Sequence, residues 1–137
     1  MFENDKDIQK AHLHKKQEDY DEAIDLYIRY YQRTKRPSGL IFAASCDIKQ
    51  GNFGEALERY EKLFREFPRE LSEEYNVLIY SKCLLEEKKF QKTYDLLYQL
   101  KARIGSKVFM QLVTYLGGKI SANDIFEKSK FEINKPN

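Results

Sequence analysis

The stretch EDYDEAIDLY (18–27) has a close counterpart 33 residues further along the chain, GNFGEALERY (51–60). Aromatic, small and aliphatic residues recur at matching places, namely Tyr20 and Phe53, Ala23 and Ala56, Ile24 and Leu57, and Tyr27 and Tyr60. A period of roughly 20 to 50 residues is typical of chains that stack copies of one small structural unit. One such unit cannot bury its own apolar face, so neighbouring units must pack on each other. The repetition therefore predicts a solenoid.

Apolar residues recur at spacings of three and four throughout most of the chain, which is the period of an amphipathic helix. No stretch alternates with a period of two over a useful length, so no sheet is expected. Proline and glycine interrupt the pattern at Pro37-Ser38-Gly39 and at Phe67-Pro68-Arg69. We predict helices over residues 4–17, 20–34, 38–50, 53–67, 72–87, 90–103, 106–117 and 121–130. Because the connections are short, consecutive helices should pack as antiparallel hairpins.

The composition of the 137 residues excludes several classes of protein. The net charge of +2 is too small for a general attraction to nucleic acid or to an anionic membrane. Two cysteines are too few for a disulfide scaffold, and no apolar run approaches the roughly 18 residues of a membrane span. The N-terminal MFENDKDIQK is charged from residue 3, so we expect no signal peptide and predict a cytoplasmic location.

The repeated residues resemble the tetratricopeptide repeat (TPR) family. Its signature places a large residue, a Leu–small pair and an aromatic in a first helix, then Ala and an aromatic in a second helix, with Pro near the end. The second repeat matches best, with Leu40, Ala43, Ala44, Gly51, Phe53, Ala56, Tyr60 and Pro68. The first repeat offers Ala11, Tyr20, Ala23 and Tyr27, but Asp7, Lys10 and His14 stand where apolar residues are usual. The third reads Val77, Tyr80, Ser81, Leu84, Phe90, Thr93, Leu97 and Gly105, after about three extra residues near Arg69–Ser72.

The resemblance implies an all-α fold: a right-handed α-solenoid of about three TPR-like helix hairpins plus two C-terminal helices. The repeats would span residues 4–36, 37–71 and 72–105 of a single domain over 1–131, with capping helices at 106–130 and a frayed tail at 132–137. Small residues would stand where the two helices of each hairpin approach closely, at Ala11, Ala44 and Ser81 and at Ala23, Ala56 and Thr93.

Candidates for catalysis or metal binding are poor. His12 and His14 are two residues apart and point to different faces of a helix, whereas a helical zinc pair needs a spacing of four. Cys46 and Cys83 occupy equivalent places in successive repeats, and we expect them to be small apolar fillers of the core. The chain has no phosphate-binding loop, no CxxC and no Gly-x-Ser-x-Gly. We therefore predict no catalytic residue, no metal, no cofactor and no enzymatic activity.

In similar proteins the first helices of the repeats line a concave groove that takes a peptide or a partner's helix. The resemblance places nine partner-binding residues there: His12, Lys15, Ile41, Ser45, Ile48, Tyr75, Leu78, Lys82 and Leu85, with Phe42 at the edge. One subclass of the family clamps a C-terminal carboxylate with Lys, Asn and Arg. Only Lys15 and Lys82 are basic here and no Asn is suitably placed, so we do not expect that clamp.

Apolar residues in a row on a surface usually have something that covers them. Our first hypothesis is an apolar helix or extended peptide of a partner protein, as for a chaperone or adaptor. Helix 121–130, with Ile125 and Phe126, or a second copy of the chain in a homodimer could instead occupy the groove. A different hypothesis is an immunity or inhibitor protein that binds the folded surface of a toxin or enzyme through a charged convex or edge face. Neither nucleic acid nor a membrane is expected as a partner.

Overall fold

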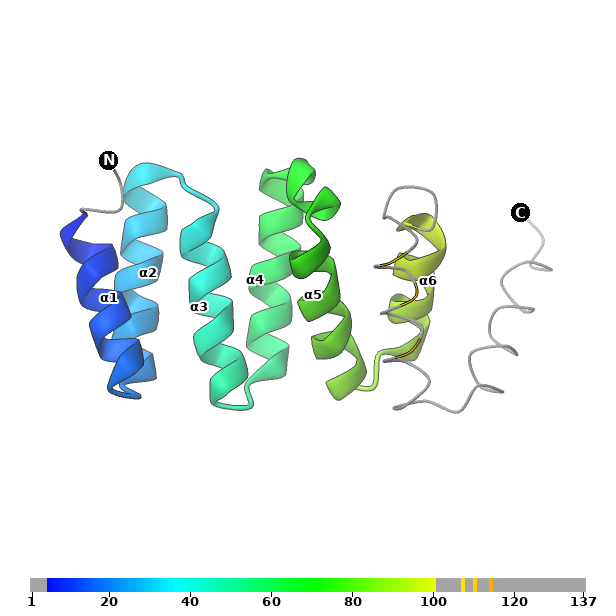
Figure 1. Cartoon of the computed structure of the whole chain (residues 1–137), viewed down its shortest axis with the longest axis horizontal. Coiled ribbons are helices and arrows are strands. Elements are labelled where there is room, and N and C mark those ends of the chain that lie inside the picture. The colour runs from blue at the N-terminus through cyan, green and yellow to red at the C-terminus, as the bar shows by residue number, and fades with distance from the viewer. Residues whose placement is uncertain (1–4, 101–106, 108–109, 111–113, 115–137) are drawn as a thin grey trace. The chain divides into compact units, whose positions relative to one another are not determined.

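The computed structural model describes residues 5–100 and the single positions 107, 110 and 114. Within these residues all regular structure is helical (Figure 1). The chain divides into two compact units, Met1–Leu71 and Ser72–Asn137, which we call the N-terminal and C-terminal units. The predicted all-α class is confirmed. None of the helices described is long and apolar enough to cross a membrane.

The N-terminal unit contains four helices: α1 (Lys6–Lys16), α2 (Tyr20–Thr34), α3 (Ser38–Lys49) and α4 (Phe53–Glu66). Each helix packs against the next, α1 on α2, α2 on α3 and α3 on α4. Connections of three residues join them, which forces each pair into an antiparallel hairpin. The four predicted helices are confirmed to within two residues at every end.

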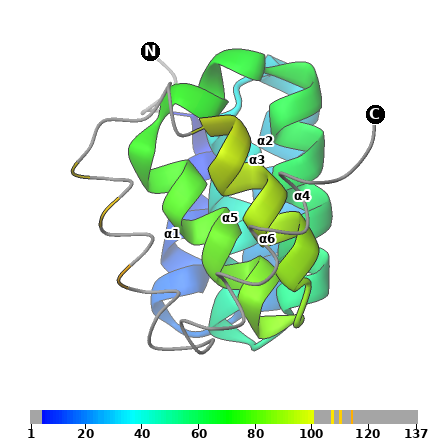
Figure 2. The ribbon, with the colours of Figure 1, turned by 90° about the vertical axis from the view of Figure 1, so that its right-hand side faces the viewer.

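The C-terminal unit begins with the hairpin of α5 (Glu74–Glu86) and α6 (Phe90–Leu100), whose helices pack on each other (Figure 2). The helix predicted from residue 72 begins two residues later, at Glu74, because Pro68–Ser72 forms a short 3₁₀ helix, η2, and Glu73 is extended. The predicted helices 106–117 and 121–130 lie outside the described residues, apart from the helical positions Lys107, Met110 and Thr114.

The turn inside each hairpin has the same backbone geometry in all three repeats. A residue with positive φ precedes the second helix by two positions: Glu18 (64°), Gly51 (77°) and Lys88 (56°). The following N–H closes the turn on the carbonyl five residues back, in the bonds Asp19 to His14, Asn52 to Asp47 and Lys89 to Leu84, each 2.8 Å. This bond is that of a Schellman motif, and glycine is its usual residue because it adopts positive φ without strain. Only Gly51 meets that preference.

The small residues at the helix crossings are buried, as predicted. Ala11, Ala44 and Ser81 on the first helices, and Ala23, Ala56 and Thr93 on the second helices, are each no more than 1 % exposed. Burial requires the two hydroxyls to find partners, and Ser81 donates to the Val77 carbonyl while Thr93 donates to the Lys89 carbonyl. Cys46 and Cys83 are buried free thiols, as expected of core fillers.

Polar residues at both ends of α1 have partners on α2 or at its N-terminal cap. Asp5 caps α1 by accepting from the backbone N–H of Asp7 at 2.9 Å. Arg33, in the last turn of α2, donates to both Asp5 carboxylate oxygens at 2.6 Å and to Asp7 at 3.2 Å. His14 pairs with Asp19 at 3.3 Å. A network of charges therefore holds the start of α1 to α2 where the repeat pattern would have an apolar contact.

Candidate functional site

Some of the predicted partner-binding residues of the N-terminal unit contact one another across α1 and α3. Lys15 Nζ donates to Ser45 Oγ at 2.7 Å, which joins the two helices although 30 residues separate the partners. Ser45 Oγ donates in turn to the Phe42 carbonyl at 2.7 Å. We define the α1/α3 face by His12, Lys15, Ile41, Phe42, Ser45 and Ile48.

The ring of His12 is held by contacts with two aromatic side chains. Its Nδ1 lies 2.5 Å from Tyr27 Oη, and its ring stands edge-on to Phe42 with centroids 5.0 Å apart and an interplanar angle of 88°. Burial, and then the nearby charge of Lys15, lower the pKa of His12, so the imidazole is neutral at pH 7. Burial raises the pKa of Tyr27, so its hydroxyl keeps its proton, and it shares a hydrogen bond with Nδ1 of His12.

The α1/α3 face combines three apolar side chains with polar ones, one of which is a cation. Ile41, Phe42 and Ile48 are half-buried, so part of each side chain reaches the surface. Lys15 is also half-buried, and it forms no ion pair with any carboxylate of the described residues. A half-buried ammonium that has only a hydroxyl as partner favours the approach of an anion.

The remaining predicted binding residues lie on α5, in the C-terminal unit. Tyr75 is 67 % exposed, whereas Leu78 and Lys82 are half-buried. Their spacing of three and four places them on one face of α5. Leu85 is buried at 6 % exposure, so it takes part in core packing and offers little surface to a partner.

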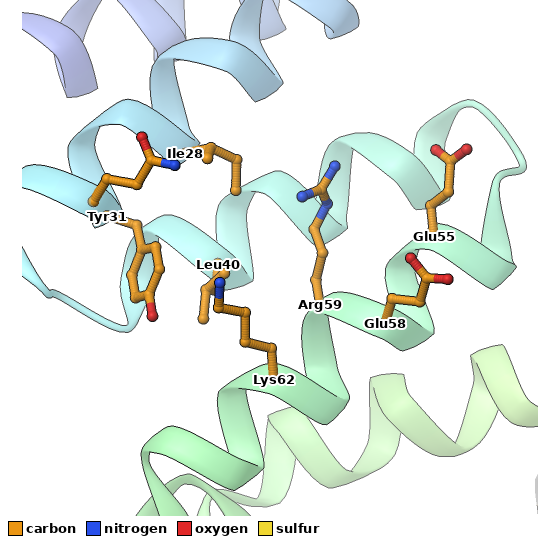
Figure 3. Close-up of a pocket in the computed structure, with 8 residues that line it drawn as sticks. Ile28, Tyr31, Leu40, Glu55, Glu58, Arg59 and Lys62 are labelled. Atoms are coloured by element: carbon orange, nitrogen blue, oxygen red, sulfur yellow. The ribbon is translucent and has the colours of Figure 1, made fainter.

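A second feature, not predicted from the sequence, is a cleft of about 440 Å³ in the N-terminal unit (Figure 3). We call it the α2/α4 cleft, since α2 and α4 form its walls and Leu40 of α3 its floor. It is lined by Ile28, Tyr31, Gln32, Leu40, Glu55, Glu58, Arg59 and Lys62. Figure 3 shows Arg59 and Lys62 extending from α4 toward α3, with Glu55 and Glu58 nearer the start of α4.

Arg59 is fixed in the cleft by a buried carboxylate. Its Nε donates to Asp47 Oδ2 at 2.5 Å, and the Asp47 side chain is 1 % exposed. Burial raises the pKa of Asp47, and the charge and hydrogen bond of Arg59 oppose that rise. Asp47 Oδ1 has no hydrogen-bond partner among the described residues.

The pair escaped the sequence analysis because its partners lie on different helices. One signal could have revealed it. The TPR pattern W-x₂-L-G-x₂-Y places Asp47 at the aromatic position, three residues after Ala44. A carboxylate in place of a core aromatic needs a buried cation, and Arg59 of the next helix supplies it.

Among the described residues, no group of three or more His, Cys, Asp or Glu side chains is arranged to hold a metal ion. His12 and His14 point to different partners, Tyr27 and Asp19, as their spacing predicts. The side chains described above form a surface with apolar and charged groups.

Comparison of the fold with solved structures gives a clear likeness. The crystal structure of the Sgt2 TPR domain from Aspergillus fumigatus matches with a TM-score of 0.64, over 100 % of this chain and 87 % of that chain. This chain has a TPR fold. The sequences are 17 % identical, so the likeness concerns the fold alone. The predicted TPR resemblance is thereby confirmed in three dimensions, while no family model matches the sequence. No curated protein matches it either.

Proposed function

We propose that this protein is a non-catalytic binding module that holds an apolar helix or peptide of a partner protein, as a chaperone or adaptor does. The first helices α1 and α3 would form the binding surface of the N-terminal unit, and α5 would offer corresponding side chains in the C-terminal unit. The observation that carries the proposal is the α1/α3 face, where Ile41, Phe42 and Ile48 remain partly exposed beside Lys15. Partly exposed apolar side chains in a row favour a partner that covers them.

The spacing on α3 suits a helical or extended partner. Ile41, Ser45 and Ile48 stand at positions i, i+4 and i+7, which places them in one stripe along the helix. Amphipathic helices dock into such surfaces through apolar anchors at the same spacings. Lys15 would favour an acidic residue next to those anchors, and Lys82 would do the same on α5. Tyr75 and Leu78 extend the proposal to the third repeat.

The test compares variants as baits in a pull-down from an extract of the cells that make the protein. Ile41→Asp and the double variant Ile41→Asp/Leu78→Asp place a charge on the proposed surface. Leu13→Asp is the matched control, because Leu13 is 53 % exposed on α1 and lies outside the α1/α3 face. Circular dichroism first establishes that all variants are folded.

We expect a specific partner to be retained by wild type and Leu13→Asp and to be reduced at least ~10-fold by the double variant, as for loss of a central anchor. Equal retention by all variants would exclude this surface. Light scattering measures the oligomeric state and so distinguishes a partner protein from a second copy of the chain. If wild type is a dimer and the Ile41→Asp variant is not, a second copy of the chain covers the face.

A further inference from the structure

The α2/α4 cleft holds two basic side chains, Arg59 and Lys62, and among the described residues neither forms an ion pair with the glutamates that line the cleft. Apart from its bond to Asp47, Arg59 makes no hydrogen bond or ion pair within the part of the chain that the structure describes. Lys62 Nζ lies 5.3 Å from the centre of the Tyr31 ring and likewise forms no ion pair there. Glu55 and Glu58 precede Arg59 and Lys62 by four residues on α4. No ion pair forms between Glu55 and Arg59 or between Glu58 and Lys62.

Arg59 is prepared for a ligand by the way Asp47 holds it. A guanidinium has five N–H donors, and the bond to Asp47 uses the one on Nε. The four N–H groups of the two Nη atoms remain for another acceptor. Because the Asp47 side chain is buried, it restricts the rotation of the guanidinium and lowers the entropy lost when a ligand binds. A planar guanidinium held in this way matches a carboxylate with two parallel hydrogen bonds. Asp47 is thus a positioning residue.

Ile28 offers the cleft one apolar contact. Leu40 is 2 % exposed and forms the floor, while Ile28 is half-buried on the α2 wall. The Tyr31 ring lies beside Lys62, and its hydroxyl is occupied by Glu66. A volume of about 440 Å³ accommodates one or two side chains of a docking segment.

We propose that the α2/α4 cleft is a second protein-docking site, which binds an acidic side chain that a partner presents between apolar residues. Arg59 and Lys62 would take the carboxylate, and an apolar neighbour would lie on Ile28. The inference does not depend on the α1/α3 face, because the cleft uses other side chains of the N-terminal unit. A folded partner with an exposed Glu or Asp fits this chemistry.

The test titrates the full chain with two short peptides and follows backbone and side-chain N–H signals by NMR. The probe is acetyl-Leu-Glu-Leu-amide, and its neutral match is acetyl-Leu-Gln-Leu-amide. Contacts of this size correspond to millimolar dissociation constants, so the titration runs to about 20 mM. We expect saturable shifts at the Arg59 Nε–H and at residues lining the cleft, with the Glu peptide binding at least ~10-fold tighter than the Gln peptide.

Three variants assign the effect to the cleft. Arg59→Gln should weaken binding of the Glu peptide at least ~10-fold, while Arg65→Gln should leave it within about twofold. Arg65 is an exposed residue of α4 outside the cleft, so its replacement changes the net charge equally. Arg59→Gln also leaves Asp47 buried without its cation, so a second variant, Lys62→Gln, tests the cleft without that change. We expect Lys62→Gln to lower the affinity for the Glu peptide by about threefold or more.

The proposal is overturned if the two peptides bind equally, if the shifts fall outside the cleft, or if no saturable shift occurs by the end of the titration. It is also overturned if Lys62→Gln binds the Glu peptide as wild type does. Should Arg59→Gln fail to fold, Lys62→Gln and the peptide pair decide the matter.

Discussion

Gly39 brings the start of α3 into close contact with α2, and Gly39→Ala should loosen the junction between the first two hairpins. A Cβ atom built at Gly39 would lie 2.7 Å from Tyr31 Cβ and 2.8 Å from the Tyr27 carbonyl oxygen. Ordinary contacts begin at 3.4 Å. Neither neighbouring atom belongs to the far end of a flexible side chain, so the backbone of α3 has to move away from α2.

Two opposing effects set the size of the stability change that Gly39→Ala causes. Overpacking a close contact costs typically about 1–3 kcal/mol. Replacing Gly by Ala inside a helix contributes up to about 1 kcal/mol of stability. We therefore expect Gly39→Ala to lower the free energy of unfolding by about 1–2 kcal/mol, which corresponds to a fall in Tm of about 3–7 °C for a chain of this length.

The assay is urea unfolding followed by circular dichroism, with thermal melts as a second measurement. Gly54 provides the matched control, because it is the second residue of α4 as Gly39 is of α3, and it is exposed. Gly54→Ala should raise the free energy of unfolding by up to about 1 kcal/mol. If Gly39→Ala is as stable as Gly54→Ala, the close approach of α3 to α2 does not limit packing and the reasoning is refuted.

Two further predictions concern pH. Hydrogen bonding to Arg33 holds the pKa of Asp5 below its ordinary value of 3.8, so this pair stabilises the fold above about pH 4 and stops doing so as the pH falls through the lowered value. The difference in unfolding free energy between wild type and Arg33→Gln should therefore shrink between pH 5 and about pH 2; a constant difference would contradict it. Burial lowers the pKa of His12 below 6.5, so the folded state resists protonation and wild type should lose stability as the pH falls through that value. His12→Gln should lose less stability than wild type over the same pH range, as measured by the urea midpoints of unfolding. An equal loss of stability in the two proteins would show that His12 is not the group responsible.

The repeat in the sequence was enough to predict the helices of the N-terminal unit and the contacts at their crossings. Ala11, Ala23, Ala44 and Ala56 are buried because a hairpin allows only small side chains where its helices meet. That requirement is local and recurs in every repeat, so small residues recur in the sequence at the period of the repeat. The positive φ angles of the turns could not be predicted from the sequence in the same way, since Glu18 and Lys88 adopt them without being glycine.

The sequence by itself determined the helical period, the hairpins and the small residues between them. Only the tertiary structure decided which polar groups meet across helices. Lys15 and Ser45 are 30 residues apart, and Asp47 and Arg59 are 12 apart on different helices. The α2/α4 cleft likewise depends on how far α2 and α4 stand apart above Leu40. Such contacts follow from the packing of whole helices. Because many residue types would serve at each position, the spacing of residues in the sequence does not predict these contacts.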